Sequence, residues 1–247
     1  MKNHLVLFSP NEDVQRAIRF CKWAHGKQKR KYIGEPYYNH CFEVASITML
    51  RADVSPEPTI IALLHDVLED TAVHRDRIGE AFGARVLEGV ELLTESPCFE
   101  ESGLNRAARK RQTIERLREA PRYIKAIKLA DIISNTPSIV KYDPKFAGLY
   151  IQEVRALLPA LSEGDKVLYA LCGKILSEGF KDLYPPDTRK AELLANNYIV
   201  FRKRAETTTN EAYRAESLAE AERAAKQYEE IMGYPLRLFN TSTGTVV

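Results

Sequence analysis

The sequence contains no apolar run long enough to cross a bilayer and no secretory signal at its first residues. A membrane-spanning helix needs about 20 consecutive apolar residues, and charged side chains interrupt every apolar run well before that length. The short apolar patch 5–8 is followed directly by Pro10 and the acidic pair Glu12 and Asp13, unlike a signal peptide. We therefore expect no membrane partner and a cytoplasmic location.

Cysteine is scarce and widely spaced. The chain has four cysteines, Cys21, Cys41, Cys98 and Cys172, and no two of them form a C-x-x-C pair. Such spacing indicates neither a disulfide framework nor a zinc motif. We expect all four to be reduced thiols.

An excess of one charge sign is also absent. The 36 basic side chains nearly balance the 34 acidic ones and leave a net charge of +2. A surface so balanced does not attract a polyanion as a whole. We therefore expect neither DNA nor RNA as a partner.

Alternating strand patterns are nearly absent, and apolar residues recur at helical spacing along the whole chain. This periodicity predicts an all-α fold. The run Lys181–Pro186, with two adjacent prolines, suggests a boundary between a domain at 1–180 and a helical extension at 181–247 that packs on it. The alanine-rich stripe of a predicted helix at 210–232 would allow close helix approach, so a homodimer contact is possible.

Several helix boundaries follow from local signals. A capping box at Ser9–Glu12, with Pro10 at the first helical position, predicts a helix that ends near Gly26. Gly83 is expected to break the helical stripe that follows residue 71, and Pro137 to interrupt a helix that begins at Pro121. Further helices are expected at 104–119, 145–162, 165–179 and 191–204, the last despite strand propensity at Tyr198–Phe201.

The segment Ala62–Thr71 carries the strongest chemical signal. It combines apolar residues with His65, Asp66, Glu69 and Asp70 on consecutive turns of an expected helix. Residues three or four apart share a helix face. Such a cluster is costly in an apolar setting unless a cation balances it, so the segment predicts a metal site.

Two distant residues could complete that site. His25 lies at the end of the first expected helix, and Asp131 is a lone carboxylate on a largely apolar helix. Helices from distant segments can converge in a bundle and point such side chains inward. Structural roles remain open for each: His25 could complement a helix dipole, His65 could be a core histidine, and Asp131 could pair with Lys128.

The predicted ligand set is therefore His25, His65, Asp66 and Asp131. Two imidazoles and two carboxylates suit one divalent ion of intermediate hardness, for which we expect Mn²⁺, with iron, zinc or cobalt as alternatives. His40 is expected to form a hydrogen bond within the fold rather than to bind metal.

A basic loop directly follows His25 and includes Lys27, Lys29, Arg30 and Lys31. Ammonium and guanidinium groups there could bind the phosphates of a substrate held at the metal. The alternative is an ordinary solvated loop. The basic helix at 104–119 could add phosphate contacts, although charged helix faces usually meet only solvent.

Three sequence blocks together resemble the HD-domain hydrolases of the RelA/SpoT-homologue type, especially the stand-alone small alarmone hydrolases of metazoan type. The blocks are Ala24–Lys31 with Gly34–Tyr37 and Asn39-His40, then Ala62–Thr71, and then Ile127–Asp131 with Asn135. Their order and spacing agree over about residues 12–180. Cys41 stands where proline is common in the family, and Ser138 where threonine is common.

The resemblance implies an all-helical bundle around one manganese ion. It implies removal of the 3′-pyrophosphate from guanosine tetra- and pentaphosphate (ppGpp and pppGpp), which gives GDP or GTP and pyrophosphate. His25, His65, Asp66 and Asp131 would then be metal ligands, and Glu69 and Asp70 the acid/base and water-orienting pair. Expected substrate contacts are Lys27, Arg30, Lys31, Asn135 and Ser138.

Other functions remain open at this stage. Some members of the family remove the 2′-phosphate of NADPH, so a different nucleotide phosphohydrolase is one alternative, and release of orthophosphate would identify it. A nucleotide-sensing HD module without catalysis is another, although Glu69 and Asp70 argue against it because a sensor needs no proton transfer. A purely helical interaction protein would bind no divalent ion.

Overall fold

The computed structural model describes residues 4–51, 55–95, 105–183 and 189–232. Within these ranges every extended regular element is a helix, and the one backbone bridge joins Lys29 to Pro36 in the loop before α2. The prediction of an all-α fold is confirmed. None of the described helices is long and apolar enough to traverse a membrane.

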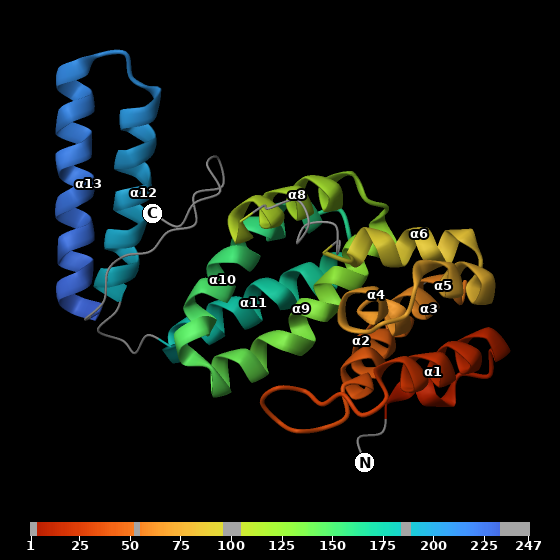
Figure 1. Cartoon of the computed structure of the whole chain (residues 1–247). Helices are drawn as coiled ribbons and strands as arrows, with labels where there is room; N and C mark the ends of the chain where they lie inside the picture. Colours follow the sequence, from red (N-terminus) through yellow and green to blue (C-terminus); the bar gives the residue numbers. More distant parts are fainter. Residues whose placement is uncertain (1–3, 52–54, 96–104, 184–188, 233–247) are drawn as a thin grey trace.

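The main body consists of two groups of helices that lie side by side (Figure 1). The first group comprises η1 (Leu5–Phe8), α1 (Glu12–His25), α2 (Tyr38–Arg51), α3 (Glu57–Leu64), α4 (Val67–Asp70), α5 (Arg75–Phe82) and α6 (Ala84–Leu93). The second comprises α8 (Arg106–Glu119), α9 (Arg122–Tyr142), α10 (Pro144–Leu157), η2 (Leu158–Leu161) and α11 (Lys166–Leu183).

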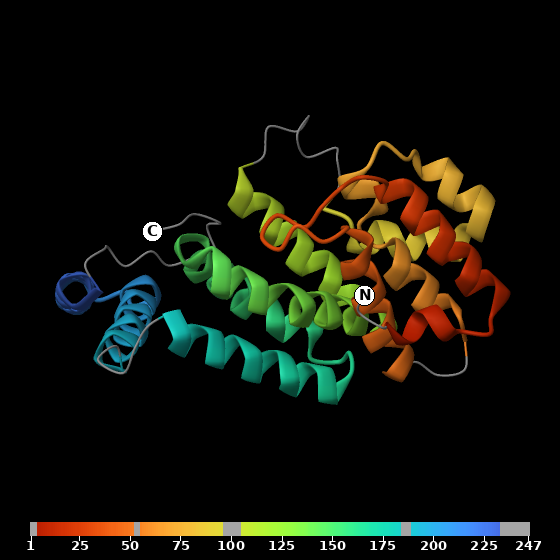
Figure 2. The ribbon, with the colours of Figure 1, turned by 90° about the horizontal axis from the view of Figure 1, so that it is seen from below.

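Helix α9 joins the two groups. It packs against α2, α3 and α6 on one side and against α10 and α11 on the other. Seen from below, α11 covers the outer side of the second group (Figure 2). Because α9 carries Asp131, the packing of this helix brings that carboxylate to the boundary between the two groups.

Helix α3 lies in the centre of the first group. Its residues Thr59–Leu64 are all buried, as expected for a helix that is apolar on every side. Helices α1, α2, α6 and α9 surround it. The polar residues that follow Leu64 are therefore held at the buried end of α3.

The structure confirms several predicted boundaries and corrects others. Gly83 separates α5 from α6 with a φ of 88°, a conformation that favours glycine. Helix α1 begins at Glu12 rather than at Pro10, because the Asn11 side chain accepts the amide hydrogens of Asp13 and Val14 and so forms the cap. Pro137 lies inside α9 and does not end it.

The last two helices, α12 (Arg189–Thr207) and α13 (Glu211–Met232), form an antiparallel pair that stands beside the main body (Figure 1). The strand alternative for Tyr198–Phe201 is wrong, since these residues lie within α12. Leu194, Ala224 and Tyr228 form a small apolar cluster within the pair, separate from the main core. Packing of the extension on the domain and a homodimer contact stay predictions.

We expect Gly89→Ala to lower the free energy of unfolding by about 1–3 kcal/mol through overpacking. A Cβ at position 89 of α6 would lie 2.5 Å from Cδ1 of Ile61 and 3.3 Å from Cδ1 of Ile124, and both isoleucines are fully buried. Chemical denaturation measures the change. The control is Gly173→Ala in α11, where a Cβ meets no atom within 4 Å and helix propensity alone predicts a gain of up to about 1 kcal/mol. Equal effects of the two substitutions would contradict this view of the contact between α3 and α6.

Candidate metal centre and active site

The predicted helix over 62–71 is interrupted in its middle. Helix α3 ends at Leu64, and α4 begins at Val67. Between them, Asp66 has φ and ψ of −99° and −1°, outside the range of a regular α-helix. The interruption separates the acidic pair at the end of α4 from His65, which is buried, and Asp66, which is half-buried.

Two imidazoles and two carboxylates meet at this point. Nε2 of His65 lies 3.1 Å from Oδ2 of Asp66 and 3.7 Å from Oδ1 of Asp131. The second imidazole belongs to His40 in α2, whose Nε2 lies 3.4 Å from Asp66 and 3.2 Å from Asp131. Both imidazoles are buried. We call these four residues the His/Asp cluster.

The partners of the Nδ1 atoms fix how both imidazoles are oriented. Nδ1 of His65 lies 2.8 Å from the carbonyl oxygen of Ala62, which can only accept a hydrogen bond. Nδ1 of His40 lies 2.9 Å from Oγ of Ser134, and Ser134 donates its own hydrogen to Glu43. Each Nδ1 therefore carries a hydrogen, and each neutral imidazole turns the lone pair of Nε2 toward the two carboxylates.

Opposing lone pairs and carboxylates require positive charge between them. Neither Nε2 has a hydrogen-bond partner of good geometry among the described residues. Burial alone would lower the pKa of His65, but the negative charge of Asp66 and the nearby Asp131 carboxylate raise it well above its ordinary value. Two added protons or one divalent cation would balance the two carboxylates equally well.

The donor set fits a divalent cation. His40, His65 and Asp131 place one potential ligand atom each within 4.8 Å of one another. Two imidazole nitrogens and carboxylate oxygens suit an ion of intermediate hardness. Ser134 and the carbonyl oxygen of Ala62 hold the imidazoles from behind, in the way that outer partners hold metal-binding histidines.

The structure does not bring His25, the fourth predicted ligand, into this cluster. Its Nδ1 lies 2.8 Å from Oε1 of Gln28, and its Nε2 lies 3.6 Å from Sγ of Cys41. The ring of Tyr37 packs against His25, while the Tyr37 hydroxyl donates to Asp66. Tyr37 therefore stands next to the cluster, and the place predicted for His25 is taken by His40.

A cavity of about 340 Å³ opens beside the cluster. Asp66 and Asp131 of the cluster line it together with Asn135, and Glu69 and Asp70 of α4 line the same cavity. Its lining also includes the apolar and aromatic residues Ile114, Ile132, Ile139, Phe146, Tyr150, Val154 and Leu157. The cavity thus combines polar groups from the cluster with apolar surface that a flat ring could contact.

Glu69 and Asp70 have different surroundings within this cavity. The Glu69 side chain reaches solvent at the mouth, yet the cavity walls and the charge of Asp66 raise its pKa to about 7. Its Oε2 accepts the amide hydrogen of Glu95 at 3.0 Å. Asp70 accepts a longer bond of 3.5 Å from Nε2 of Gln28. A carboxyl with a pKa near neutrality is suited to proton transfer at ordinary pH.

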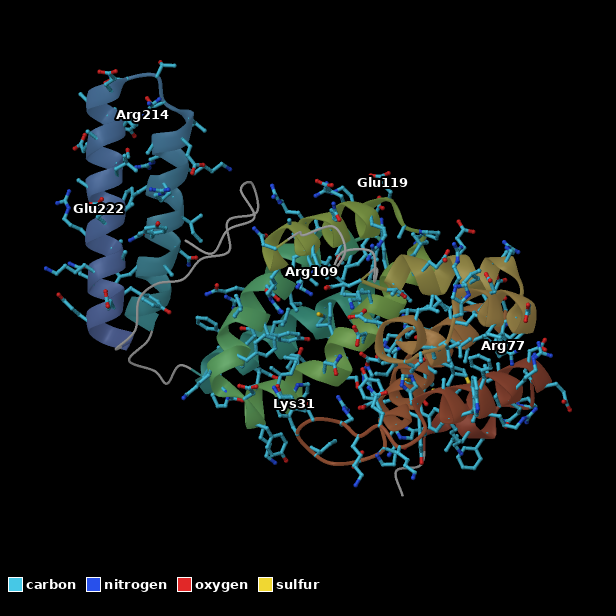
Figure 3. All side chains as sticks on the ribbon, viewed as in Figure 1. Lys31, Arg77, Arg109, Glu119, Arg214 and Glu222 are labelled. Atoms are coloured by element: carbon cyan, nitrogen blue, oxygen red, sulfur yellow. The ribbon has the colours of Figure 1, made fainter. Side chains whose placement is uncertain are left out.

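Only one of the five predicted substrate contacts, Asn135, lines the cavity. Arg30 donates to Oδ1 of Asn135 at 3.0 Å and lies 3.8 Å from Glu43, so it ties the basic loop to α9 and α2. Lys31 pairs with Asp143 at the edge of the bundle (Figure 3). Lys27 is exposed on the loop, and Ser138 donates to the carbonyl oxygen of Asn135.

Other basic groups line the cavity instead. Lys128 donates to Asp131 at 2.8 Å, and Lys110 of α8 forms an ion pair with Glu95. Arg106 binds both carboxylate oxygens of Glu153 at 2.6 and 2.8 Å. The sequence offers helix α8 only as a possible source of phosphate contacts, since periodicity does not show which charged residues of a helix face a cavity. No sequence signal singled out Tyr37.

Comparison with known proteins identifies relatives over most of the main body. The HD domain family matches residues 17–157. The chain is 33% identical to the guanosine-3′,5′-bis(diphosphate) 3′-pyrophosphohydrolase of Aquifex aeolicus, over 72% of this chain and 25% of that protein. It is 32% identical to the enzyme of the same name, MESH1, of Drosophila melanogaster, over 51% of this chain and 69% of that one.

The chain thus spans only a quarter of the Aquifex protein but more than two thirds of MESH1. Among solved structures, a metazoan ortholog of SpoT that hydrolyses ppGpp superposes with a TM-score of 0.61 at 24% identity. The match covers 69% of this chain and 97% of the other. At this identity, the likeness supports the fold.

We expect Ser134→Ala to weaken binding of Mn²⁺ roughly 10- to 100-fold, because His40 would lose the partner that fixes its ring. Titration calorimetry with metal-free protein measures the affinity. Ser138→Ala, one turn further along α9, removes only a bond to the carbonyl oxygen of Asn135 and should leave the affinity unchanged. Equal affinities of the two variants would remove Ser134 from the support of the site.

We also expect Glu69→Gln to raise the unfolding temperature of metal-free protein at pH 8 but not at pH 4. The pKa of Glu69 is about 7 in the folded chain and about 4.3 when unfolded. The folded state therefore holds this proton more firmly, and the resulting stability is lost as the pH rises through 7. A glutamine side chain does not ionise between pH 4 and pH 8, so the variant does not lose this stability as the pH rises. Thermal unfolding scans with chelator between pH 4 and pH 8 measure the effect. The control is Glu115→Gln on the exposed side of α8. A difference in unfolding temperature between Glu69→Gln and the wild type that did not change with pH would contradict the assignment.

Proposed function

The chain belongs to the HD-domain family, and we propose that it hydrolyses the 3′-pyrophosphate of guanosine 3′,5′-bis(diphosphate) with the aid of one divalent cation. The observation that carries the proposal is the His/Asp cluster, in which the lone pairs of two buried imidazoles face the carboxylates of Asp66 and Asp131 beside a cavity. The names of the relatives support the choice of substrate.

In this proposal His40, His65, Asp66 and Asp131 hold the cation, for which we keep Mn²⁺ as the expected ion. A bound divalent cation would lower the pKa of water and offset phosphate charge. Tyr37 and Asn135 hold the carboxylates of Asp66 and Asp131 by hydrogen bonds of 2.8 and 2.7 Å. The charge of Lys128 favours the ionised form of Asp131.

Glu69 is the proposed proton-transfer residue. As water attacks the phosphorus next to the 3′ oxygen, the Glu69 carboxylate takes a proton from that water. The bond between phosphorus and the 3′ oxygen breaks, and the proton is returned to the leaving oxygen. The products are GDP and pyrophosphate. Asp70, held by Gln28 at the same mouth, is the proposed water-orienting group.

The cavity offers complementary chemistry to the rest of a nucleotide. Lys110, Lys128 and Arg106 supply positive charge for phosphate groups. Phe146 and Tyr150, whose ring centroids lie 6.2 Å apart, supply an aromatic surface for a base.

The described cysteines, Cys21, Cys41 and Cys172, are free thiols, which supports the cytoplasmic location expected from the sequence. Cys98 lies outside the described residues.

Purified protein incubated with guanosine 3′,5′-bis(diphosphate) and Mn²⁺ is expected to release pyrophosphate and GDP, and a chelator should stop the reaction. Glu69→Gln should bind Mn²⁺ but lose roughly 10²- to 10⁴-fold in kcat. Chromatography of the nucleotides and a pyrophosphate assay identify the products, and calorimetry follows the ion.

The substrate control is NADPH under the same conditions. Orthophosphate from NADPH, with no pyrophosphate from the guanosine substrate, would replace the proposed reaction by a 2′-phosphatase. Glu115→Gln should retain full activity. Undiminished turnover in Glu69→Gln would remove that residue from the mechanism.

A further inference from the structure

We propose that the chain has a second metal site, formed by Cys21, His25 and Cys41, that binds a thiophilic ion such as Zn²⁺ or Cd²⁺. The three side chains place Sγ, an imidazole nitrogen and Sγ within 4.8 Å of one another. All three are buried. We call this group the Cys/His cluster, and it does not depend on the proposed reaction.

The three donors come from two helices. Cys21 and His25 are four residues apart in α1 and therefore share one face of that helix. Cys41 projects from α2, directly after His40. The contact between α1 and α2 thus brings together cysteines that are 20 positions apart in the sequence, which is why their spacing did not reveal a metal motif.

The hydrogen bond at Nδ1 of His25 leaves the other ring nitrogen, Nε2, available to bind a metal ion. Gln28 donates from Nε2 to Asp70, so its Oε1 is the atom that accepts the Nδ1 hydrogen of His25 at 2.8 Å. The neutral imidazole therefore presents the lone pair of Nε2 toward Cys41. A hydrogen bond of this kind, made by the ring nitrogen that does not bind the ion, fixes the orientation of most metal-binding histidines.

The observed spacing suits a thiophilic ion. Bond lengths of about 2.3 Å to sulfur and 2.0 Å to nitrogen place tetrahedral ligands roughly 3.6 Å apart. Nε2 of His25 and Sγ of Cys41 are already 3.6 Å apart. Only small side-chain adjustments would then bring Sγ of Cys21 into the coordination sphere of the same ion.

Charge balance favours an ion in this dry interior. A divalent ion replaces the two thiol protons of Cys21 and Cys41, so the net charge of the core does not change on binding. A buried charge without a partner would be strongly unfavourable, but two thiolates neutralise the ion completely. Sulfur donors also select zinc and related ions over manganese, magnesium and calcium.

The Cys/His cluster adjoins the His/Asp cluster without sharing its ligands. Cys41 also lies within 4.8 Å of His65 and Asp66, and Tyr37 stands between His25 and Asp66. The two groups differ in donor chemistry, one with oxygen and nitrogen and the other with sulfur and nitrogen. The Cys/His cluster would therefore bind soft, thiophilic ions and the His/Asp cluster harder ions. An ion in the Cys/His cluster would link α1 to α2.

Metal-stripped full-length protein titrated with Co²⁺ tests the proposal. Thiolate-to-cobalt charge-transfer absorption should appear in the wild type and be lost in Cys21→Ser and in Cys41→Ser. Cys172→Ser, which removes a buried thiol of α11, should keep it. The wild type should bind one more equivalent of Cd²⁺ than Cys21→Ser or Cys41→Ser, and this ion should raise the unfolding temperature of the wild type. Mn²⁺ should change the unfolding temperature of the wild type and of both variants by the same amount.

Asp131→Asn separates this proposal from the proposed function. It should abolish the binding of Mn²⁺ and the activity, yet keep the charge-transfer absorption. Circular dichroism excludes a folding defect, and His25→Gln provides a variant that keeps both thiols but loses the nitrogen donor. Absence of the absorption in folded wild type, or its full retention in Cys41→Ser, would overturn the second site.

Discussion

The arrangement of the main body depends on two neighbouring carboxylates, Asp131, which is buried, and Asp66, which is half-buried, whose combined negative charge exceeds the single positive charge of Lys128. Asp66 and Asp131 face each other across the Nε2 atoms of His40 and His65. Hydrogen bonds on the far side of both imidazoles turn lone pairs, not hydrogens, toward them. Such an arrangement is unfavourable unless additional positive charge completes it, which supports the proposed cation.

Three buried helices make this arrangement possible. Helix α2 supplies His40, the end of α3 supplies His65 and Asp66, and α9 supplies Asp131. The helices pack directly on one another, so their side chains are positioned by the core rather than by loops. Glu69, by contrast, lies on the short helix α4 at the cavity mouth, where contact with solvent suits a group that exchanges protons.

The sequence predicted what is local and missed what depends on packing. The helical fold, His65, Asp66 and Asp131 follow from periodicity and from ionisable residues in apolar surroundings. The expectation that His25 rather than His40 joins the cluster does not match the geometry, because periodicity describes the face of one helix but not what lies opposite it. The contact between α1 and α2 places His25 beside Cys41. Lys110 could not be singled out for the same reason, since it is one of several basic residues on α8. Pro137 shows that packing can retain a helix that local rules would end.

The basic groups of the cavity are already engaged, Arg106 with Glu153 and Lys110 with Glu95. A ligand that recruits them must outcompete a carboxylate each time, so these ion pairs set an electrostatic threshold for entry. A nucleotide with a single phosphate has little charge with which to exceed that threshold, whereas a nucleotide with diphosphates at both the 3′ and the 5′ position carries several times more. Selectivity would then arise from the number of negative charges as much as from the shape of the base, and it would weaken as added salt screens the competition.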